Sequence, residues 1–150
     1  METLQKIEQF VAQRHIAVAG ISRNPGKFGN AIFKELKKQG YTLYPISQHM
    51  TEFEGEKCYP DIASLPELVS GIVINTKAEQ TKILLQQSKD KGISNIWLQQ
   101  GSSNASIQAD AASMDRNVIT GQCILMFAHP THFIHRAHRF MNKLIGKYPK

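Results

Sequence analysis

The chain has 150 residues, of which 41% are hydrophobic, enough apolar surface for one core of ordinary size and a single domain. Its longest apolar run, residues 123–128, is far shorter than the roughly 20 residues of a membrane-spanning helix, and its N-terminus lacks a signal-peptide pattern. These two features predict a cytoplasmic protein without a membrane partner. The net charge is +6, but residues 1–115 hold 12 basic and 12 acidic side chains, so the main body is neutral and a nucleic-acid partner is disfavoured.

Helical and extended patterns alternate along the chain from residue 3 to residue 120. Helical segments show apolar residues at three- and four-residue spacing, and the strands are short, nearly continuous apolar runs. In order, the predicted elements are a helix over 3–14, a strand over 15–20, a helix over 28–39, a strand over 41–46, turns through 47–70 with a short helix at 65–69, a strand over 71–75, a helix over 78–91, a strand over 95–98, a helix over 104–114 and a strand over 117–120. This alternation predicts an α/β fold with a doubly wound, parallel, five-stranded sheet, whose ligands bind beyond the carboxyl ends of the strands.

The loop after the first predicted strand has the composition of a phosphate-binding turn. Gly20 and Gly29 allow the backbone to approach a ligand closely, and the helix that follows directs its free N–H groups and positive dipole end at the loop. Ser22, Arg23 and Lys27 add hydrogen-bond donors. A tight strand-to-helix turn with incidental basic residues is the structural alternative.

The same loop departs from the dinucleotide fingerprint G-x-G-x-x-G, because Ser22 stands where the second glycine belongs. An NAD site also needs an acidic residue at the end of the second strand, where this chain has Ser47. NAD binding is therefore disfavoured. NADP remains open, since Arg23, Lys27 or His49 is able to receive its 2′-phosphate.

Several motifs between roughly residues 14 and 123 are similar to those of a known family. The first motif is residues 18–25 together with Lys27, Phe28 and Gly29, and the second is Gly40 and Tyr41 followed by Pro45 and Ile46. The third is Gly55 with Tyr59 and residues 64–66, and the fourth is residues 96–101, which contain the sequence Trp-Leu-Gln-Gln-Gly. The chain resembles the small CoA-binding domain proteins related to the nucleotide domain of the α-subunit of succinyl-CoA synthetase. The resemblance implies a Rossmann-like sheet that binds CoA along its carboxyl edge, usually without demonstrated enzymatic activity.

The resemblance also implies which residues face the ligand. By comparison with the family's first loop, the residues expected to lie near the CoA diphosphate are Gly20, Ile21, Ser22, Arg23, Lys27, Phe28 and Gly29. Ser47 is expected nearby, although this chain replaces the family's Pro-Val-Asn-Pro with residues 45–48, and Thr76 and Lys77 are candidates for the adenosine end. Gln99 and Gly101 end the fourth strand, so we predict them at the ligand edge as well, with loop geometry as the alternative.

We expect Trp97 and the two cysteines to have structural roles. Trp97 lies within a predicted strand and is expected in the core. Cys123 follows the last strand at a position where the resembled family often carries cysteine; a buried, inert thiol is the interpretation we adopt, and contact with an acyl or thiol group is the alternative. Neither Cys58 nor Cys123 has the spacing of metal ligands, so we expect free thiols and no zinc.

Residues 124–150 are predicted to form a basic helical extension of the domain made by residues 1–123. The six cations that follow residue 115 are Arg116, Arg136, Arg139, Lys143, Lys147 and Lys150. Four histidines recur at three-residue spacing, His129, His132, His135 and His138, but no carboxylate or cysteine accompanies them to complete a metal site. We expect an amphipathic helix over 131–145 that packs on the domain or, in a homodimer, on a second copy. A solvated helix face explains the same charge pattern.

These features favour a non-catalytic module that binds or senses CoA or an acyl-CoA, a small nucleotide ligand. The alternative is an enzyme, either an NADP-linked oxidoreductase or an acyl-transfer protein that uses Cys123. The sequence shows no carboxylate pair, activated serine or paired histidine and cysteine that supports this alternative.

Overall fold

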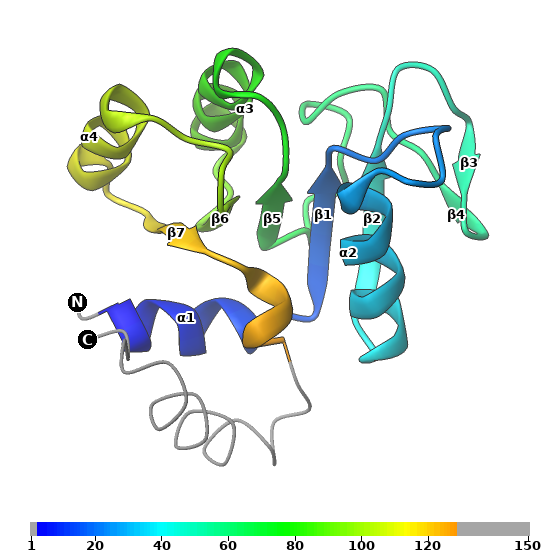
Figure 1. Ribbon diagram of the computed structural model, residues 1–150, viewed down its shortest axis with the longest axis horizontal. Helices are drawn as coiled ribbons and strands as arrows, with labels where there is room; N and C mark the ends of the chain where they lie inside the picture. Colours follow the sequence, from blue (N-terminus) through cyan, green and yellow to red (C-terminus); the bar gives the residue numbers. More distant parts are fainter. Residues whose placement is uncertain (1–2, 129–150) are drawn as a thin grey trace.

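The computed structural model describes residues 3–128, which form a three-layer α/β fold (Figure 1). The helices are α1 (Thr3–Val11), α2 (Phe28–Lys38), α3 (Ala78–Lys91), α4 (Ala105–Ser113) and the short 3-10 helix η1 (Ile124–Met126). The strands are β1 (His15–Ala19), β2 (Thr42–Ile46), β3 (Glu52–Phe53), β4 (Glu56–Lys57), β5 (Gly71–Ile74), β6 (Asn95–Gln99) and β7 (Asn117–Gln122). The helix predicted over 131–145 and the four histidines lie outside the described residues. No helix within residues 3–128 has the length and apolar character needed to cross a membrane.

The main sheet has five parallel strands in the order β2-β1-β5-β6-β7, which confirms the predicted doubly wound, Rossmann-like fold. Ile16 of β1 pairs with Leu43 of β2 on one side and with Gly71 of β5 on the other. The chain winds from β1 out to β2 and then crosses back to β5, so the winding direction reverses between β1 and β5. The carboxyl ends of these two strands therefore border the crevice where such sheets bind ligands.

Two apolar cores lie on opposite faces of the sheet. The first core is covered by α1, α2 and η1, and it contains Phe10, Phe33 and the predicted core residue Trp97, all fully buried. The second core is covered by α3, α4 and residues 62–69. Because both faces of the sheet are covered, the strands carry apolar runs, such as residues 16–19 of β1 and 72–74 of β5, which is why they could be identified from the sequence.

Two of the predicted helices differ from the structure by more than one residue at an end. The helix α1 ends at Val11 rather than at residue 14, and the Tyr41 hydroxyl donates a 2.7 Å hydrogen bond to the Val11 carbonyl, which satisfies that helix end. The short helix predicted at 65–69 does not form. Those residues make turns instead, in which the Val69 N–H donates to the Pro66 carbonyl. A segment of this length gains too little from helix propagation to form a regular helix.

A small hairpin of β3 and β4 occupies part of the stretch for which only turns were predicted. Each strand has two residues, too few for a strand pattern to show in the sequence. The turn is made by Glu54 and Gly55, both with positive φ, and Lys37 of α2 donates to the Glu54 carbonyl. Phe53 contacts Phe33 edge to face, with ring centroids 5.0 Å apart. The hairpin thereby fastens the loop after β2 to α2.

Candidate functional site

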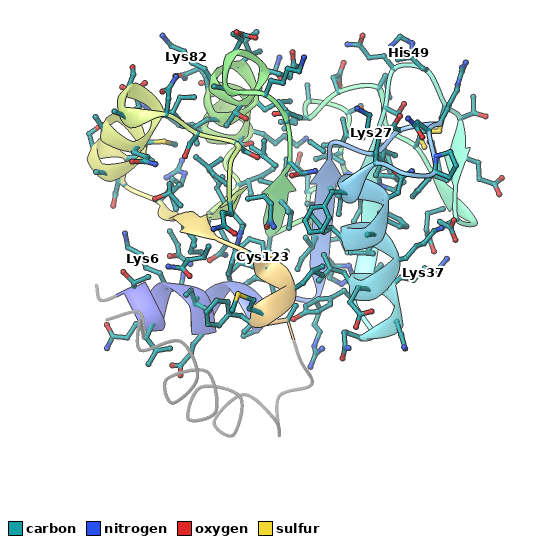
Figure 2. All side chains as sticks on the ribbon, in the orientation of Figure 1. Lys6, Lys27, Lys37, His49, Lys82 and Cys123 are labelled. Atoms are coloured by element: carbon teal, nitrogen blue, oxygen red, sulfur yellow. The ribbon has the colours of Figure 1, made fainter. Side chains whose placement is uncertain are left out.

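Three adjoining hollows follow the carboxyl edge of the main sheet, the end at which Lys27 and His49 lie in Figure 2. The central hollow, of about 500 Å³, is lined by Gly20, Ser22, Lys27, Phe28, Gly29, Asn75, Thr76, Lys77, Gln100, Gly101 and Ser102. The Arg23 hollow, of about 250 Å³, is lined by Ile21, Ser22, Arg23, Ser47, His49 and Met50. A third hollow, of about 520 Å³, is lined by residues of β1, β2 and α3 and shares Gly20 and Thr76 with the central hollow.

Gly20 and Gly29 allow three backbone segments to meet at the central hollow. A Cβ atom on Gly20 would lie 2.1 Å from the carbonyl oxygen of Asn75, and a Cβ atom on Gly29 would lie 2.0 Å from the carbonyl oxygen of Gly20. Gly20 also has a φ angle of +113°, in the region that other residues rarely adopt. A larger residue at either position would push the loop after β1 away from the end of β5.

The buried side chain of Asn30, in the first turn of α2, holds this loop in shape. Only 3% of the residue is exposed. Its Oδ1 accepts a hydrogen bond from the Ser22 N–H at 2.8 Å, and its Nδ2 donates to the carbonyl oxygens of Ser22 at 2.8 Å and Asn24 at 3.0 Å. The Asn24 side chain in turn accepts from the Gly26 N–H at 3.1 Å. The path of the loop is therefore fixed from within the domain.

The helices α2 and α3 both begin at the central hollow, and neither has a side-chain cap. Their N-cap residues are Lys27 and Lys77, which make no capping hydrogen bond, whereas the Asn104 side chain caps α4 by accepting from the Ile107 N–H at 2.9 Å. Lysine is unfavourable at an N-cap, because it offers no acceptor and its charge opposes the positive end of the helix dipole. The arrangement surrounds one hollow with helix-end N–H donors and two ammonium groups, which suits an anion.

The structure brings most of the predicted site residues together. Gly20, Ser22, Lys27, Phe28, Gly29, Thr76, Lys77 and Gly101 line the central hollow, and Ile21, Arg23 and Ser47 line the Arg23 hollow. Gln99 lies elsewhere, because its side chain points to the same face of the sheet as Trp97. There its Nε2 contacts the Cys123 sulfur and its Oε1 accepts from the Ile124 N–H, both at 3.0 Å.

Four residues that line or shape the central hollow were not predicted from the sequence. Asn75, Gln100 and Ser102 line the central hollow, and Asn30 shapes its loop. Asn75 and Gln100 follow the ends of β5 and β6, so their positions in the sequence were a usable signal. Asn30 gave no such signal, since a polar residue in a helix with one apolar face is expected on the solvent side.

The Arg23 hollow is formed where the loops after β1 and β2 are tied together. The Arg23 guanidinium donates to the backbone carbonyl of His49. The Ser47 hydroxyl oxygen accepts from the N–H groups of His49 at 3.1 Å and Met50 at 3.2 Å. No acidic residue is among those that line this hollow.

Neither cysteine lines any of the three hollows, and both are free thiols. Cys123 precedes η1, on the side of α1 (Figure 2). Cys58 is buried; burial raises the pKa of its thiol, and the Glu52 carboxylate adds to the rise. Within residues 3–128, no three His, Cys, Asp or Glu side chains are grouped so as to hold a metal ion.

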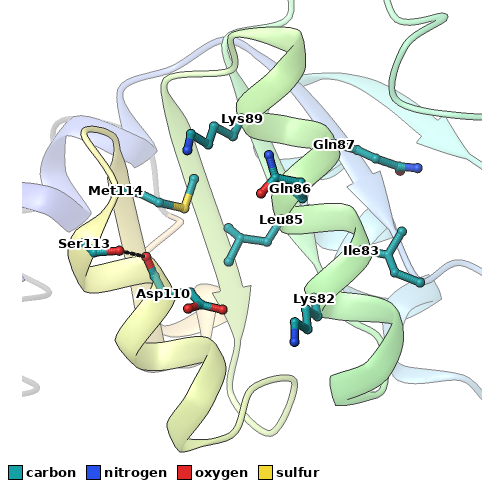
Figure 3. A pocket seen from close by; sticks show the side chains of 9 residues that line it. All are labelled: Lys82, Ile83, Leu85, Gln86, Gln87, Lys89, Asp110, Ser113 and Met114. Carbon is teal, nitrogen blue, oxygen red and sulfur yellow. Dashed lines mark hydrogen bonds between the residues drawn. The ribbon is translucent and has the colours of Figure 1, made fainter.

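A larger hollow, of about 590 Å³, lies between α3 and α4, and Figure 3 shows Leu85 and Met114 pointing into it. This hollow is lined by side chains from the sides of two helices, and neither a glycine-containing loop nor an uncapped helix N-terminus is part of its lining. Ligands of parallel α/β sheets gather instead at the carboxyl ends of the strands. We therefore place the candidate site at the carboxyl edge.

Comparison with known proteins gives one family match and several relatives. A family model described as a CoA binding domain matches residues 14–129. The α-subunit of ADP-forming acetate–CoA ligase II from Pyrococcus furiosus is 32% identical over 91 residues, which is 60% of this chain and 20% of that protein. The chain therefore spans about a fifth of the length of this curated relative.

Two solved structures are similar over most of their own length. A conserved hypothetical protein from Pyrococcus furiosus has a TM-score of 0.71 and 30% identity, and the match covers 75% of this chain and 97% of that one. A hypothetical protein from Pyrococcus horikoshii shares the fold, with a TM-score of 0.73 and 23% identity over 91% of this chain and 90% of that one.

Proposed function

Because the chain belongs to the CoA-binding domain family, we propose that it binds coenzyme A or an acyl-CoA at the carboxyl edge of its sheet, as a non-catalytic binding or sensing module. The family match includes every residue that lines the central hollow. It supports the class of ligand, and the arrangement of this chain's own residues supports where the ligand binds.

The observation that carries the proposal is the pair of uncapped helix starts at the central hollow. The CoA diphosphate offers two negative charges and several acceptor oxygens, which match the free N–H groups of α2 and α3 and the ammonium groups of Lys27 and Lys77. Gly20 and Gly29 let the loop after β1, the end of β5 and the start of α2 pack closely together, which brings these backbone segments to one hollow.

The rest of the ligand is proposed to follow the edge of the sheet in both directions from the diphosphate. Toward β6, Thr76 and Gly101 line the central hollow, and the lining of the same hollow includes the apolar side chain of Phe28, which is 49% exposed. Toward β2, the Arg23 hollow continues the edge with Arg23 and Ser47. An extended ligand such as CoA has the length to contact both parts.

We propose binding rather than catalysis. A match over a fifth of the acetate–CoA ligase subunit supports a shared ligand, not the ligase reaction. The Cys123 sulfur contacts the amide of Gln99 and does not line the central hollow, so its position favours the structural role over acyl transfer. Two free thiols are in keeping with a reducing compartment, and we propose that the protein works in the cytoplasm.

Two measurements test the proposal. Native mass spectrometry of the purified protein is expected to show bound CoA or acyl-CoA, and calorimetric titration is expected to give one site for CoA or acetyl-CoA that is tighter than the sites for NADP and NAD. Tighter binding of NADP than of CoA would redirect the assignment to the oxidoreductase class. Absence of binding by all four compounds would overturn the proposal.

A further inference from the structure

We infer that the face of the domain made by α3 and α4 binds a second copy of this chain. The centre of this face is the α3–α4 hollow, the space of about 590 Å³ lined by side chains between Lys82 and Lys89 of α3 and between Asp110 and Met114 at the end of α4. None of its lining residues lines the central hollow, so the homodimer leaves the site proposed for CoA open in both copies.

The α3–α4 hollow has an apolar floor. Leu85 is 4% exposed and belongs to the core on this face of the sheet, and Met114 packs against the same core. Figure 3 shows both side chains pointing into the hollow, one from each helix. Ile83, which is 52% exposed, adds apolar surface on the α3 side. Because protein interiors are close-packed, an open apolar space of this size between two helices suits a further pair of helices that fills it.

The charged groups around the hollow are arranged to pair with those of a second copy. Lys82 and Lys89 lie on α3 and Asp110 on α4, and none of the three forms an ion pair within residues 3–128. In Figure 3, Lys89 and Asp110 lie on opposite sides of the hollow and toward its opposite ends, with Leu85 and Met114 between them. A twofold axis through the middle of the hollow exchanges both the sides and the ends. It therefore places Lys89 of each copy beside the partner's Asp110.

The same axis stacks α3 of one copy on α4 of the other, in antiparallel orientation. Within one copy the two helices run in the same direction, because α3 links the parallel strands β5 and β6, and α4 links β6 to the parallel strand β7. The four helices of the two copies then form a bundle with Leu85 and Met114 of both copies at its centre, surrounded by the methylene groups of lysine and glutamine side chains.

The composition of α4 allows a second helix to approach it closely. Apart from Asp110, its exposed residues are alanine, serine and glutamine: Ala105, Ser106, Gln108, Ala109, Ala112 and Ser113. The separation of two packed helices is set by the side chains at their contact, and short side chains permit a small separation. The basic segment 129–150 is a poorer occupant, since it carries five cations and no acidic residue, while the rim of the hollow has two lysines and one aspartate.

The size of this face predicts a weak dimer. α3 has 14 residues and α4 has nine, which corresponds to about 21 Å and 14 Å of helix, each roughly 10 Å wide. Two such helices side by side offer less than the roughly 800 Å² per partner of a standard interface. A reversible monomer–dimer equilibrium that depends on protein concentration is therefore expected.

The test is sedimentation velocity over a wide range of protein concentrations. Asp110→Lys brings like charges together at two symmetry-related places in the dimer, so it is expected to raise the dimer dissociation constant at least about tenfold, and Lys89→Glu is expected to do the same. The double variant Asp110→Lys with Lys89→Glu reverses both charges of the pair and is expected to dimerise within about threefold of the parent.

The matched control combines Asp110→Lys with Lys82→Glu. It has the same net charge as the double variant, but the twofold axis does not bring Lys82 of one copy beside the partner's Asp110. It is therefore expected to remain as weak a dimer as Asp110→Lys alone. Far-UV circular dichroism and CoA titration are expected to be unchanged in all variants, because the substituted side chains are exposed and lie outside the central hollow.

The outcomes separate this inference from the proposed function. A parent that stays monomeric at every concentration, or a dimer that neither charge reversal weakens, would overturn the α3–α4 interface. A double variant that dimerises no better than the Lys82→Glu control would overturn the twofold pairing. Deletion of 129–150 is expected to leave the dimer intact, and its loss in a folded, shortened protein would assign the contact to that segment instead. Absence of CoA binding would overturn the proposed function and leave the dimer unaffected.

Discussion

Ser22 and Asn30 are joined by two hydrogen bonds of 2.8 Å, one in each direction between the backbone of Ser22 and the side-chain amide of Asn30. The pair is part-buried, and a third bond from the same amide reaches the Asn24 carbonyl. Because Asn30 lies within α2, the loop that borders both the central and the Arg23 hollow takes its shape only when this helix is in place. Folding and ligand binding are therefore coupled at this residue.

Asn30→Ala is expected to destabilise the domain by about 2–3 kcal/mol, because three part-buried hydrogen bonds are lost and the Ser22 and Asn24 groups are left without their partner. CoA affinity is expected to fall about tenfold or more. Urea unfolding measures the first effect and calorimetry the second.

The control for this variant is Asn24→Ala in the same loop. Asn24 is exposed, and its side chain accepts one hydrogen bond, from the Gly26 N–H. Its replacement is expected to change stability by no more than about 0.5–1 kcal/mol. Equal effects of the two variants would mean that the buried amide does not set the shape of the loop.

Gly29→Ala is expected to destabilise the domain by about 1–3 kcal/mol, because the new Cβ atom would lie 2.0 Å from the Gly20 carbonyl and the loop would have to move. Gly26→Ala is the matched control three residues earlier, where the nearest atom is the Asn24 side-chain oxygen at 3.5 Å. Thermal unfolding of both variants is the measurement, and a smaller loss for Gly29→Ala than for Gly26→Ala would contradict the close approach.

The parts of this structure that were predicted from the sequence are those whose pattern lies within one short stretch of residues. The strands β1, β5 and β6 each contain a run of three or more apolar residues, and the proposed phosphate-binding loop is marked by its own glycines and cations. The side-chain orientations of Asn30 and Gln99 could not be predicted in this way. Which way Asn30 points depends on the packing of α2, and the orientation of Gln99 depends on which face of β6 meets η1. Neither relation can be inferred from neighbours in the sequence.

Lys77→Asp is expected to stabilise the domain and at the same time to weaken CoA binding. Aspartate is a favoured N-cap and interacts well with the helix dipole, so the free energy of unfolding is expected to rise by about 0.5–2 kcal/mol. The same carboxylate would occupy the helix-end N–H groups and repel the diphosphate. Urea unfolding measures the expected gain in stability, and calorimetry measures the expected loss of CoA affinity. A variant that is more stable and binds CoA as well as the parent would remove the start of α3 from the ligand site.

Lys27→Ala and Arg23→Ala are each expected to weaken CoA binding by about 1–3 kcal/mol, the range for hydrogen bonds to charged groups. The control is Lys82→Ala, since Lys82 lies on α3 at the hollow that faces α4 and not at the carboxyl edge (Figure 3). Added salt is expected to weaken CoA binding to the parent more than to Lys27→Ala, because Lys27 is exposed to solvent. Unchanged affinity in both loop variants would place the ligand elsewhere.

Cys58 is expected to react with iodoacetamide more slowly than Cys123 at pH 8. The Cys58 side chain is buried, and its raised pKa leaves less of the reactive thiolate at any pH below that value. Cys123 is partly exposed, so the burial predicted for it from the sequence was wrong. Mass spectrometry of peptides after timed labelling gives both rates, and in urea the two cysteines are expected to label alike. Faster labelling of Cys58 in the native protein would show that the segment around β4 opens readily.

Two truncations distinguish the core of the domain from the basic tail that follows it. Ile124 and Phe127 are 1% and 4% exposed, and the Phe127 ring lies 6.1 Å from that of Trp97, so these residues belong to the core beneath α1 and α2. Deletion of 124–150 removes both side chains and is expected to unfold the protein, because the loss of one buried phenylalanine alone costs about 3–5 kcal/mol against a total stability of about 5–15 kcal/mol.

Deletion of 129–150 keeps that core and is expected to leave a folded domain, as judged by circular dichroism and a cooperative unfolding transition. The deleted segment carries five cations and no acidic residue. If it contributes to ligand binding, CoA affinity falls and its salt dependence weakens; if it holds a homodimer together, affinity is kept and light scattering shows a smaller particle. A shortened protein that folds, binds CoA and associates as the parent does would exclude both roles for residues 129–150.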